Sequence, residues 1–393
     1  MTTAAARRRH LRWAVELTGL PTAAGREHRV VRWVQDWLAQ RRNLALRRDR
    51  YGNMLISRKG AKRGGRPVLF TAHLDHPAFV ITKVRDRRHL ECEFRGGVRP
   101  PYFPNAKVLA YDSRDKAHRG AIIEHRKGKV FDEVTVRLSK ATEALAVDDL
   151  ATWELPRARV HKGVLEAPAC DDLAGVAAAL SAMDELRGTR GVGDVRILLT
   201  RAEETGFLGA IAACRTGLIP SSAKVIALEN SRSFAESPIG AGPILRVGDR
   251  ISIFHHGLAF EISRIAMSME SRRRGFKWQR KLMPGGACEA TTFQAFGYES
   301  VCLCLPLGNY HNMANLAEII DGQRGVKARI APEFISVADY HGLVEWLIAC
   351  GRTLSGPTRR GSDQADGAAA IRTMMEKIDA AKGYVLREKA ARI

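Results

Sequence analysis

The chain has 393 residues, of which 45% are hydrophobic and 27% are charged, and its formal net charge is +21. This composition is typical of a folded globular protein and excludes a largely disordered chain. Its apolar runs are shorter than the roughly 18 residues that a membrane span needs, and the basic start leads into an amphipathic stretch, so we expect neither a membrane protein nor a secreted one.

The positive charge has two interpretations. The basic surface could attract nucleic acid or acidic substrates, or it could be a solvated surface with no dedicated partner. The arginine-rich clusters at 7–9, 47–50 and 272–274 are dispersed, and no aromatic-basic nucleic-acid motif accompanies them. This dispersion favours the second interpretation, and we expect no specific nucleic-acid partner.

The cysteines indicate a reducing compartment. There are seven, an odd number, scattered along the chain and mostly set in apolar strand or helix patterns. Such spacing is typical of free thiols rather than of a disulfide framework. We therefore expect a cytoplasmic protein.

In chain order, the first 75 residues begin an α/β pattern. Residues 10–41 predict two helices, and Gly52-Asn53 predicts a turn between short strands at 44–48 and 54–57. Residues 68–72 form an apolar run that ends in His73, as expected for a buried strand of an open α/β sheet. In such sheets the chemistry collects at the carboxyl ends of strands.

Residues 76–166 change character. No convincing long helix interrupts them, and Gly, Pro and charged turns separate short strand-like runs. We interpret this stretch as a small all-β domain inserted into the α/β domain. The predicted strands are 79–84, 89–94, 107–111, 121–125 and 133–138.

The α/β pattern then resumes at 167–350. We therefore expect an open mixed sheet flanked by helices, in a discontinuous domain made of 1–75 and 167–350. From 351 to 393 the chain is polar, and we treat it as a peripheral tail with a short helix at 369–381. The predicted helices are 171–187, 206–215, 259–270, 289–296 and 334–349, and the predicted strands are 195–200, 224–228 and 301–305.

Five short segments supply metal-ligand residue types. His73, Glu203-Glu204 and Glu229 sit at or just after strand ends, Asp171 sits at a helix start, and His311 lies in a loop. Strand ends converge at one rim of a sheet whatever their separation along the chain. Two histidines and three carboxylates could hold a pair of divalent ions and leave one carboxylate as a base.

Each segment alone also has a structural interpretation. His73 could be a satisfied core histidine, although Asp75 could accept the other N–H of a metal-bound imidazole. Asp171 and the next aspartate could cap a helix. Glu203-Glu204 could be solvated surface, and His311 could be structural. Glu229 ends a fully apolar run, where a solvated role is less natural.

Together the segments resemble the tetrahedral and glutamyl aminopeptidases, which are cytosolic metallopeptidases with two co-catalytic ions. The resemblance runs from about residue 11 to 349. The segments that carry it are 21–27 (like P-S-G-x-E), 49–53 (D-x-x-G-N), Ala72-His73-Leu74-Asp75, Asp171-Asp172-Leu173-Ala174-Gly175 (D-D-R-x-G), Glu203-Glu204-Thr205-Gly206 (E-E-x-G) and Tyr310-His311.

This resemblance implies a role for each residue. Asp171 would bridge two ions, His73 and Glu229 would complete one site, and Glu204 and His311 would complete the other. Glu203 would be the general base that takes a proton from water and hands it to the leaving amine. Asp75 would orient His73. Zinc is the first choice of metal, and cobalt or manganese suit the same ligands.

The sequence departs from the family pattern at several positions. Glu229 stands where aspartate is usual, His76 replaces the glutamate expected after Asp75, and Leu173 replaces an arginine. In 285–290, which resembles G-G-T-D-A, Glu289 replaces aspartate. The five predicted ligands stay intact, and it is the choice of substrate that these changes put in doubt.

The resemblance implies an aminopeptidase acting on peptides, and a homo-oligomer formed through the inserted β domain. Two alternatives stay open. One is an amino-acid deacylase or dipeptidase of the same clan, whose inserted domain is usually a β-α-β-β-α-β unit, unlike 76–166. The other is a non-catalytic homologue, which the departures from the family pattern at His76, Leu173 and Glu289 leave open.

Overall fold

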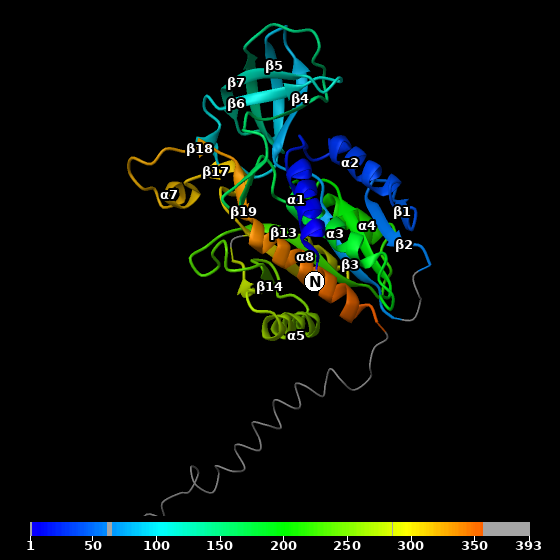
Figure 1. The fold of residues 1–393 in the computed structure, drawn as a ribbon. Helices are drawn as coiled ribbons and strands as arrows, with labels where there is room; N and C mark the ends of the chain where they lie inside the picture. Colours follow the sequence, from blue (N-terminus) through cyan, green and yellow to red (C-terminus); the bar gives the residue numbers. More distant parts are fainter. Residues whose placement is uncertain (1, 61–64, 285, 357–393) are drawn as a thin grey trace, which may run out of the picture. The chain divides into compact units, whose positions relative to one another are not determined.

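A mixed sheet of eight strands forms the centre of the fold (Figure 1). The computed structural model describes residues 2–60, 65–284 and 286–356. The four central strands are parallel to one another, and an antiparallel neighbour lies on either side of them. In spatial order the strands are β1 (Leu44–Arg48), β2 (Met54–Arg58), β12 (Val195–Thr200), β3 (Val68–His73), β13 (Lys224–Arg232), β16 (Glu299–Leu307), β14 (Ile244–Gly248) and β15 (Gln279–Leu282).

Helices cover both faces of this sheet. Helices α1, α3 and α8 share the larger apolar core with one face, and α4 and α6 share a smaller core with the other. Because both faces are covered, every residue of β3 is buried, as is usual for a central parallel strand. The helices are α1 (Ala4–Thr18), α2 (His28–Ala39), α3 (Leu173–Leu186), α4 (Leu208–Arg215), α5 (His256–Arg272), α6 (Glu289–Ala295), α7 (Leu316–Ile320) and α8 (Val337–Leu354).

Between β3 and α3 the chain forms a closed six-stranded barrel with its own apolar core. The described residues of this stretch contain no α-helix, and a short 3-10 helix, η1 (Pro100–Tyr102), is the helical turn among them. The barrel strands are β4 (Ala78–Val84), β5 (His89–Arg95), β6 (Lys107–Tyr111), β7 (Ala117–Arg126), β8 (Asp132–Leu138) and β9 (Leu150–Trp153).

Two small sheets complete the described residues. One joins β10 (Arg159–His161), β11 (Val164–Ala167) and β19 (Glu333–Ser336), and the other pairs β17 (Met313–Ala314) with β18 (Arg329–Ile330). The short helix η2 (Tyr310–Asn312) lies between β16 and β17. Strand β19 therefore ties the segment before α8 to the segment that leads into α3.

The open mixed sheet flanked by helices is confirmed, but some predicted bounds were wrong. Strand β13 does not end at residue 228, because its parallel pairing with β16 continues to Arg232. Residues 334–336 are not helical, since they pair with β11, and the Ser336 side chain accepts a hydrogen bond from the N–H of Asp339 to begin α8. Helix α8 runs past 350 to Leu354. The rest of the predicted tail, from 357, and its helix at 369–381 lie outside the described residues.

The described part of the chain contains no helix long and apolar enough to cross a membrane. Its seven cysteines are all free thiols, and six of them are buried. Burial raises the pKa of the Cys92 thiol to about 12, which keeps it protonated at neutral pH.

Candidate metal centre

The fold brings the predicted residues to one place on the sheet. His73 is the last residue of β3, and Glu203 and Glu204 follow the end of the neighbouring β12. Glu229 lies within β13, on the other side of β3. Asp171 lies two residues before the start of α3, and His311 lies in η2. Segments far apart in the sequence therefore meet because parallel strands end at a common edge.

A first group joins His73, Asp171 and Glu229. The Nε2 atom of His73 lies 3.5 Å from Oδ1 of Asp171 and 3.7 Å from Oε1 of Glu229. One ligand atom from each residue falls within 4.8 Å of the others. The three side chains are buried, so they face one another rather than solvent.

A second group joins Asp171, Glu204 and His311. The Nε2 atom of His311 lies 3.4 Å from Oδ2 of Asp171 and 3.1 Å from Oε1 of Glu204. These ligand atoms also fall within 4.8 Å of one another. Asp171 thus turns one carboxylate oxygen to each histidine, which is the geometry expected of a residue shared by two sites.

Glu203 belongs to neither of these two groups, but it forms a third group with His73 and Glu204, whose ligand atoms also fall within 4.8 Å of one another. Its Oε2 atom is 4.0 Å from Nε2 of His73, and the residue is 8% exposed. Burial raises the pKa of Glu203 well above its ordinary value, and the nearby charges of Glu204 and Glu289 add to the rise, although His73 opposes it.

The pKa values of Glu229, His73 and His311 also shift, because these side chains are buried close to other charged groups. Burial and then Asp171 raise the pKa of Glu229. Burial by itself would lower the pKa of His73, but the surrounding carboxylates, Glu203 first, raise it well above its ordinary value. Burial would also lower the pKa of His311, but the nearby carboxylates, Glu204 first, raise it well above its ordinary value. Each imidazole is therefore drawn towards carrying a positive charge.

This arrangement suits divalent cations. Three buried carboxylates and the partly buried Glu204 outnumber the two imidazoles, so positive charge is lacking even when both imidazoles are protonated. Among the described residues, Oδ1 of Asp171 accepts no hydrogen bond. Carboxylate oxygens and imidazole nitrogens are ligands that zinc, cobalt and manganese share. The donor set and its charge thus fit a pair of such ions.

Asp75 has a different principal contact from the one predicted. The Nδ1 atom of His73 faces the main-chain oxygen of Asp75 at 3.1 Å, and it lies 3.6 Å from the Asp75 carboxylate. The carboxylate accepts hydrogen bonds from the N–H groups of Glu203 and Glu204, at 3.0 and 3.1 Å. Asp75 therefore holds the backbone of the two glutamates as well as facing His73.

Glu27 supports the same loop from the other side. Its Oε1 accepts the N–H of Ala202, a residue with a φ of 53°, and its Oε2 accepts two N–H groups from Arg201. A left-handed backbone costs free energy in a residue with a side chain, so these contacts stabilise a conformation that the loop would not adopt alone.

Sequence reasoning missed Glu333, which is completely buried beside the centre. Its Oε2 accepts the N–H of Asp171 at 3.0 Å, and its Oε1 accepts the N–H of His311 at 2.8 Å. Burial raises its pKa to about 7. No motif marked it, because a lone glutamate one residue before the predicted helix at 334–349 has no local signature.

His76 was noted only as a departure from the family pattern. Its Nδ1 faces the main-chain oxygen of Asp171 at 2.5 Å, and its Nε2 faces Oδ1 of Asn312 at 3.1 Å. The position therefore joins the Asp171 and His311 segments. Glu289, another departure, is buried, and burial raises its pKa to about 7.

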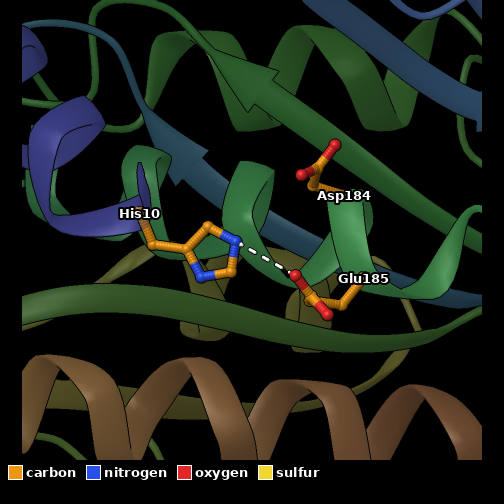
Figure 2. A group of neighbouring side chains, drawn as sticks. All are labelled: His10, Asp184 and Glu185. Atoms are coloured by element: carbon orange, nitrogen blue, oxygen red, sulfur yellow. Dashed lines mark ion pairs between the residues drawn. The ribbon is translucent and has the colours of Figure 1, made fainter. Parts of the chain in front are cut away.

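A fourth group of ligand residues, shown in Figure 2, lies at the opposite end of α3 from Asp171. His10 comes from α1, and Asp184 and Glu185 come from α3, with His10 Nε2 lying 3.3 Å from Oε1 of Glu185. Arg9 contacts both acids, and Arg41 lies 2.9 Å from Asp184. These guanidinium groups already neutralise the acids, so a divalent ion would add positive charge to a basic cluster. We interpret the group as an ion-pair cluster between helices.

Comparison with known families agrees with the motifs. The model of the M42 glutamyl aminopeptidase family matches residues 52–327, which is most of the chain. A curated relative from Acetivibrio thermocellus, an aminopeptidase by provisional name, is 22% identical over 299 residues, covering 71% of this chain and 85% of its own length.

Solved structures show the same fold. An aminopeptidase from the archaeon Desulfurococcus kamchatkensis is 20% identical, with a TM-score of 0.72 over 89% of this chain and 96% of its own. A TET peptidase from Pyrococcus horikoshii, which assembles into a tetrahedron or a large octahedral shell, is 20% identical, with a TM-score of 0.71 over 88% of this chain and 100% of its own. At this identity the likeness establishes the fold alone.

Proposed function

Since the chain belongs to the M42 glutamyl aminopeptidase family, we propose that it is a metal-dependent aminopeptidase that removes N-terminal residues from peptides. The observation that carries this proposal is the pair of buried groups that share Asp171. Each group offers one imidazole and carboxylate oxygens, and Glu203 is left over within reach of both.

We assign His73, Asp171 and Glu229 to one ion, and Asp171, Glu204 and His311 to the other. Bound there, two divalent ions would polarise the scissile carbonyl and lower the pKa of a water molecule. The excess of buried negative charge supports this assignment, because such charge is costly without a cation. Zinc is our first choice, and cobalt or manganese fit the same donors.

Glu203 is our candidate for the general base. It would accept a proton from the attacking water and pass it to the leaving amine, a task that needs a carboxylate near the reacting atoms with a pKa towards neutrality. Its burial and the direction of its pKa shift support this role. Asp75, which holds the main chain of Glu203, would fix the position of the base.

We also propose that the active form is a homo-oligomer that contacts its copies through the barrel. The TET peptidase of Pyrococcus horikoshii forms large shells, and the barrel strands β4 to β9 fall within the predicted insertion at 76–166. The domain limits of 1–75 with 167–350, and of 76–166, are part of the same proposal.

The deacylase alternative is less well supported. In that clan the inserted domain usually carries helices, whereas the described residues between β4 and β9 contain no α-helix. A non-catalytic homologue is also disfavoured, because the predicted ligands and the base are all present and lie together.

The test is elemental analysis of protein purified without chelators, alongside hydrolysis of amino-acid p-nitroanilides. We expect about two divalent ions per chain, with hydrolysis of substrates that carry a free α-amine. N-acetylated versions of the same substrates are the matched control and should be inert. Glu-, Leu- and Lys-linked substrates in one panel would reveal the preferred side chain.

Other results would select the alternatives. Two bound ions with activity only on N-acylated substrates would identify a deacylase. No bound metal, and no activity after zinc, cobalt or manganese is added, would favour the non-catalytic homologue.

A further inference from the structure

Glu333 connects the backbones of two residues that we assign as metal ligands. It is the first residue of β19 and lies beside the Asp171 segment, because β19 pairs with β11, where Ala167 is opposite Glu333. Its two carboxylate oxygens have different partners: Oε2 accepts the N–H of Asp171 and Oε1 accepts the N–H of His311. One side chain therefore spans both segments.

The His311 segment needs such support. His311 has a φ of 52°, and Asn309 and Asn312 on either side of it also lie in the left-handed region, at 51° and 64°. Three residues with side chains in this region are costly to hold in a row of four. The hydrogen bond from the N–H of His311 to Glu333, at 2.8 Å, fixes the middle of this strained turn.

The histidine ring is held at a second point. Its Nδ1 lies 2.7 Å from the main-chain oxygen of Gly97, which leaves Nε2 to face Asp171 and Glu204. Gly97 orients the ring, and Glu333 positions the backbone from which the ring projects. With Asp171 attached to the same carboxylate, the separation of the two ligands depends on Glu333.

The charge of Glu333 acts in the same direction. A carboxylate is the strongest common acceptor for main-chain N–H groups, and it accepts two of them here. Groups that support metal ligands in this way typically change metal affinity by about 10- to 100-fold when they are replaced.

We propose that Glu333 is a positioning residue for the ion assigned to Asp171, Glu204 and His311, and that it sets the affinity of that ion separately from the other. The inference rests on the proposed function, since it presupposes two bound ions. It predicts an asymmetry, because Glu333 contacts two ligands of this ion, Asp171 and His311, but only the shared Asp171 of the other. Loss of Glu333 therefore weakens this ion more than the ion assigned to His73, Asp171 and Glu229.

The main variant is Glu333→Gln, which keeps the size but loses the charge and turns an N–H₂ group towards one of the two N–H donors. The matched control is Glu345→Gln. Glu345 is also buried, but it contacts Thr2, Arg7 and Arg273 rather than the centre. A second variant, Glu333→Asp, keeps the charge but is too short to reach both donors, so we expect an intermediate effect.

The readouts are metal affinity and cobalt spectra. Full-length proteins are stripped of metal and titrated with Zn²⁺ against a chromophoric chelator, and with Co²⁺ while the visible absorption is recorded. We expect two tight ions in the wild type and in Glu345→Gln. In Glu333→Gln we expect one tight ion and a second bound about 10- to 100-fold more weakly, with one Co²⁺ band reduced.

Different results separate the two proposals. If the wild type binds no metal, the proposed function fails. If the wild type binds two ions and Glu333→Gln binds both with unchanged affinity, the role of Glu333 is wrong. If both ions weaken equally in Glu333→Gln and Glu333→Asp, Glu333 has a general structural role and the asymmetry is wrong. If Glu333→Gln does not fold, Glu333→Asp decides in the same assay.

Discussion

At the scale of single residues, the centre contains two kinds of residue. Sequence motifs predicted the first kind, and the second kind supports them but was not predicted. His73, Asp171, Glu203, Glu204, Glu229 and His311 were expected together, and they lie together. Five of them are visible in the sequence because they sit in short motifs, and Glu229 is visible because it ends an apolar run. Their roles as ligands and base stay predictions until metal and activity are measured.

The Glu203 assignment leads to a prediction at this scale. Glu203→Gln should keep both ions, since Glu203 completes neither group, but should lower kcat by about 10²- to 10⁴-fold because the amide cannot take a proton. Metal content and kcat on an unblocked p-nitroanilide are the measurements. The control is Glu204→Gln next to it, which should lose metal as well as activity. Near wild-type turnover in Glu203→Gln would rule out the base.

The supporting residues could not be predicted in the same way. Glu333 and Glu27 act through main-chain N–H groups of residues far away in the sequence. Such contacts depend on where the fold places two backbones, and a single glutamate gives no hint of that. Asp75 illustrates the same limit, since its carboxylate contacts to Glu203 and Glu204 appear only once β3 and β12 are side by side.

At the scale of elements, apolar runs identified the buried strands well, because parallel strands covered on both faces read as continuous hydrophobic segments. The strand at 195–200 was predicted to the residue. Two strands at the β15 edge of the sheet were missed. Strand β14 contains Arg246 and Gly248, and β15 has the largely polar sequence Gln-Arg-Lys-Leu, so neither has the apolar run that marks a buried strand.

The burial of His10 in α1 predicts how folding stability depends on pH. Burial, and then the charge of Arg9, lower the pKa of His10 from 6.5 to about 4. The unfolded chain therefore binds a proton between these values that the folded chain does not, so folding stability is complete above pH 6.5 and falls as the pH drops towards 4. One such group contributes at most about 1.4 kcal/mol for each pH unit.

His10→Phe should make this fall shallower. The measurement is the free energy of unfolding in urea at several pH values between 7.5 and 4, for wild type and variant. His341→Phe is a matched variant, because burial also lowers the pKa of His341 to about 4. We expect the double variant to have the shallowest slope. If both single variants and the double variant keep the pH slope of the wild type, the lowered pKa values of His10 and His341 do not explain the pH dependence.

At the scale of the whole molecule, family membership and fold agree, and assembly is the main open property. The barrel exposes apolar side chains, among them Ile123 at 43% and Val130 at 77%. Exposed apolar groups on a small domain are typical of contact surfaces. The net charge of +21 has no structural explanation in the described residues.

We predict a particle many times heavier than the 43.4 kDa chain in light scattering. Ile123→Lys should shift it to smaller species if the barrel makes the contacts, because a charge would be buried there. Phe260→Lys, at a site that is 48% exposed on α5, is the control and should leave the mass unchanged. If Phe260→Lys lowers the mass and Ile123→Lys does not, the contact surface lies on the α/β part instead of the barrel. A monomeric wild type would exclude the assembly.

The hydrogen bond between His311 and Gly97 has a consequence for the order of events in folding. Gly97 follows a barrel strand, His311 follows a strand of the central sheet, and Glu333 is contributed near the end of the described chain. Contacts between such distant segments form late, because long loops must close first. The centre is therefore complete only when nearly the whole chain is in place, so a nascent or truncated chain lacks it, and ion uptake would mark the end of maturation.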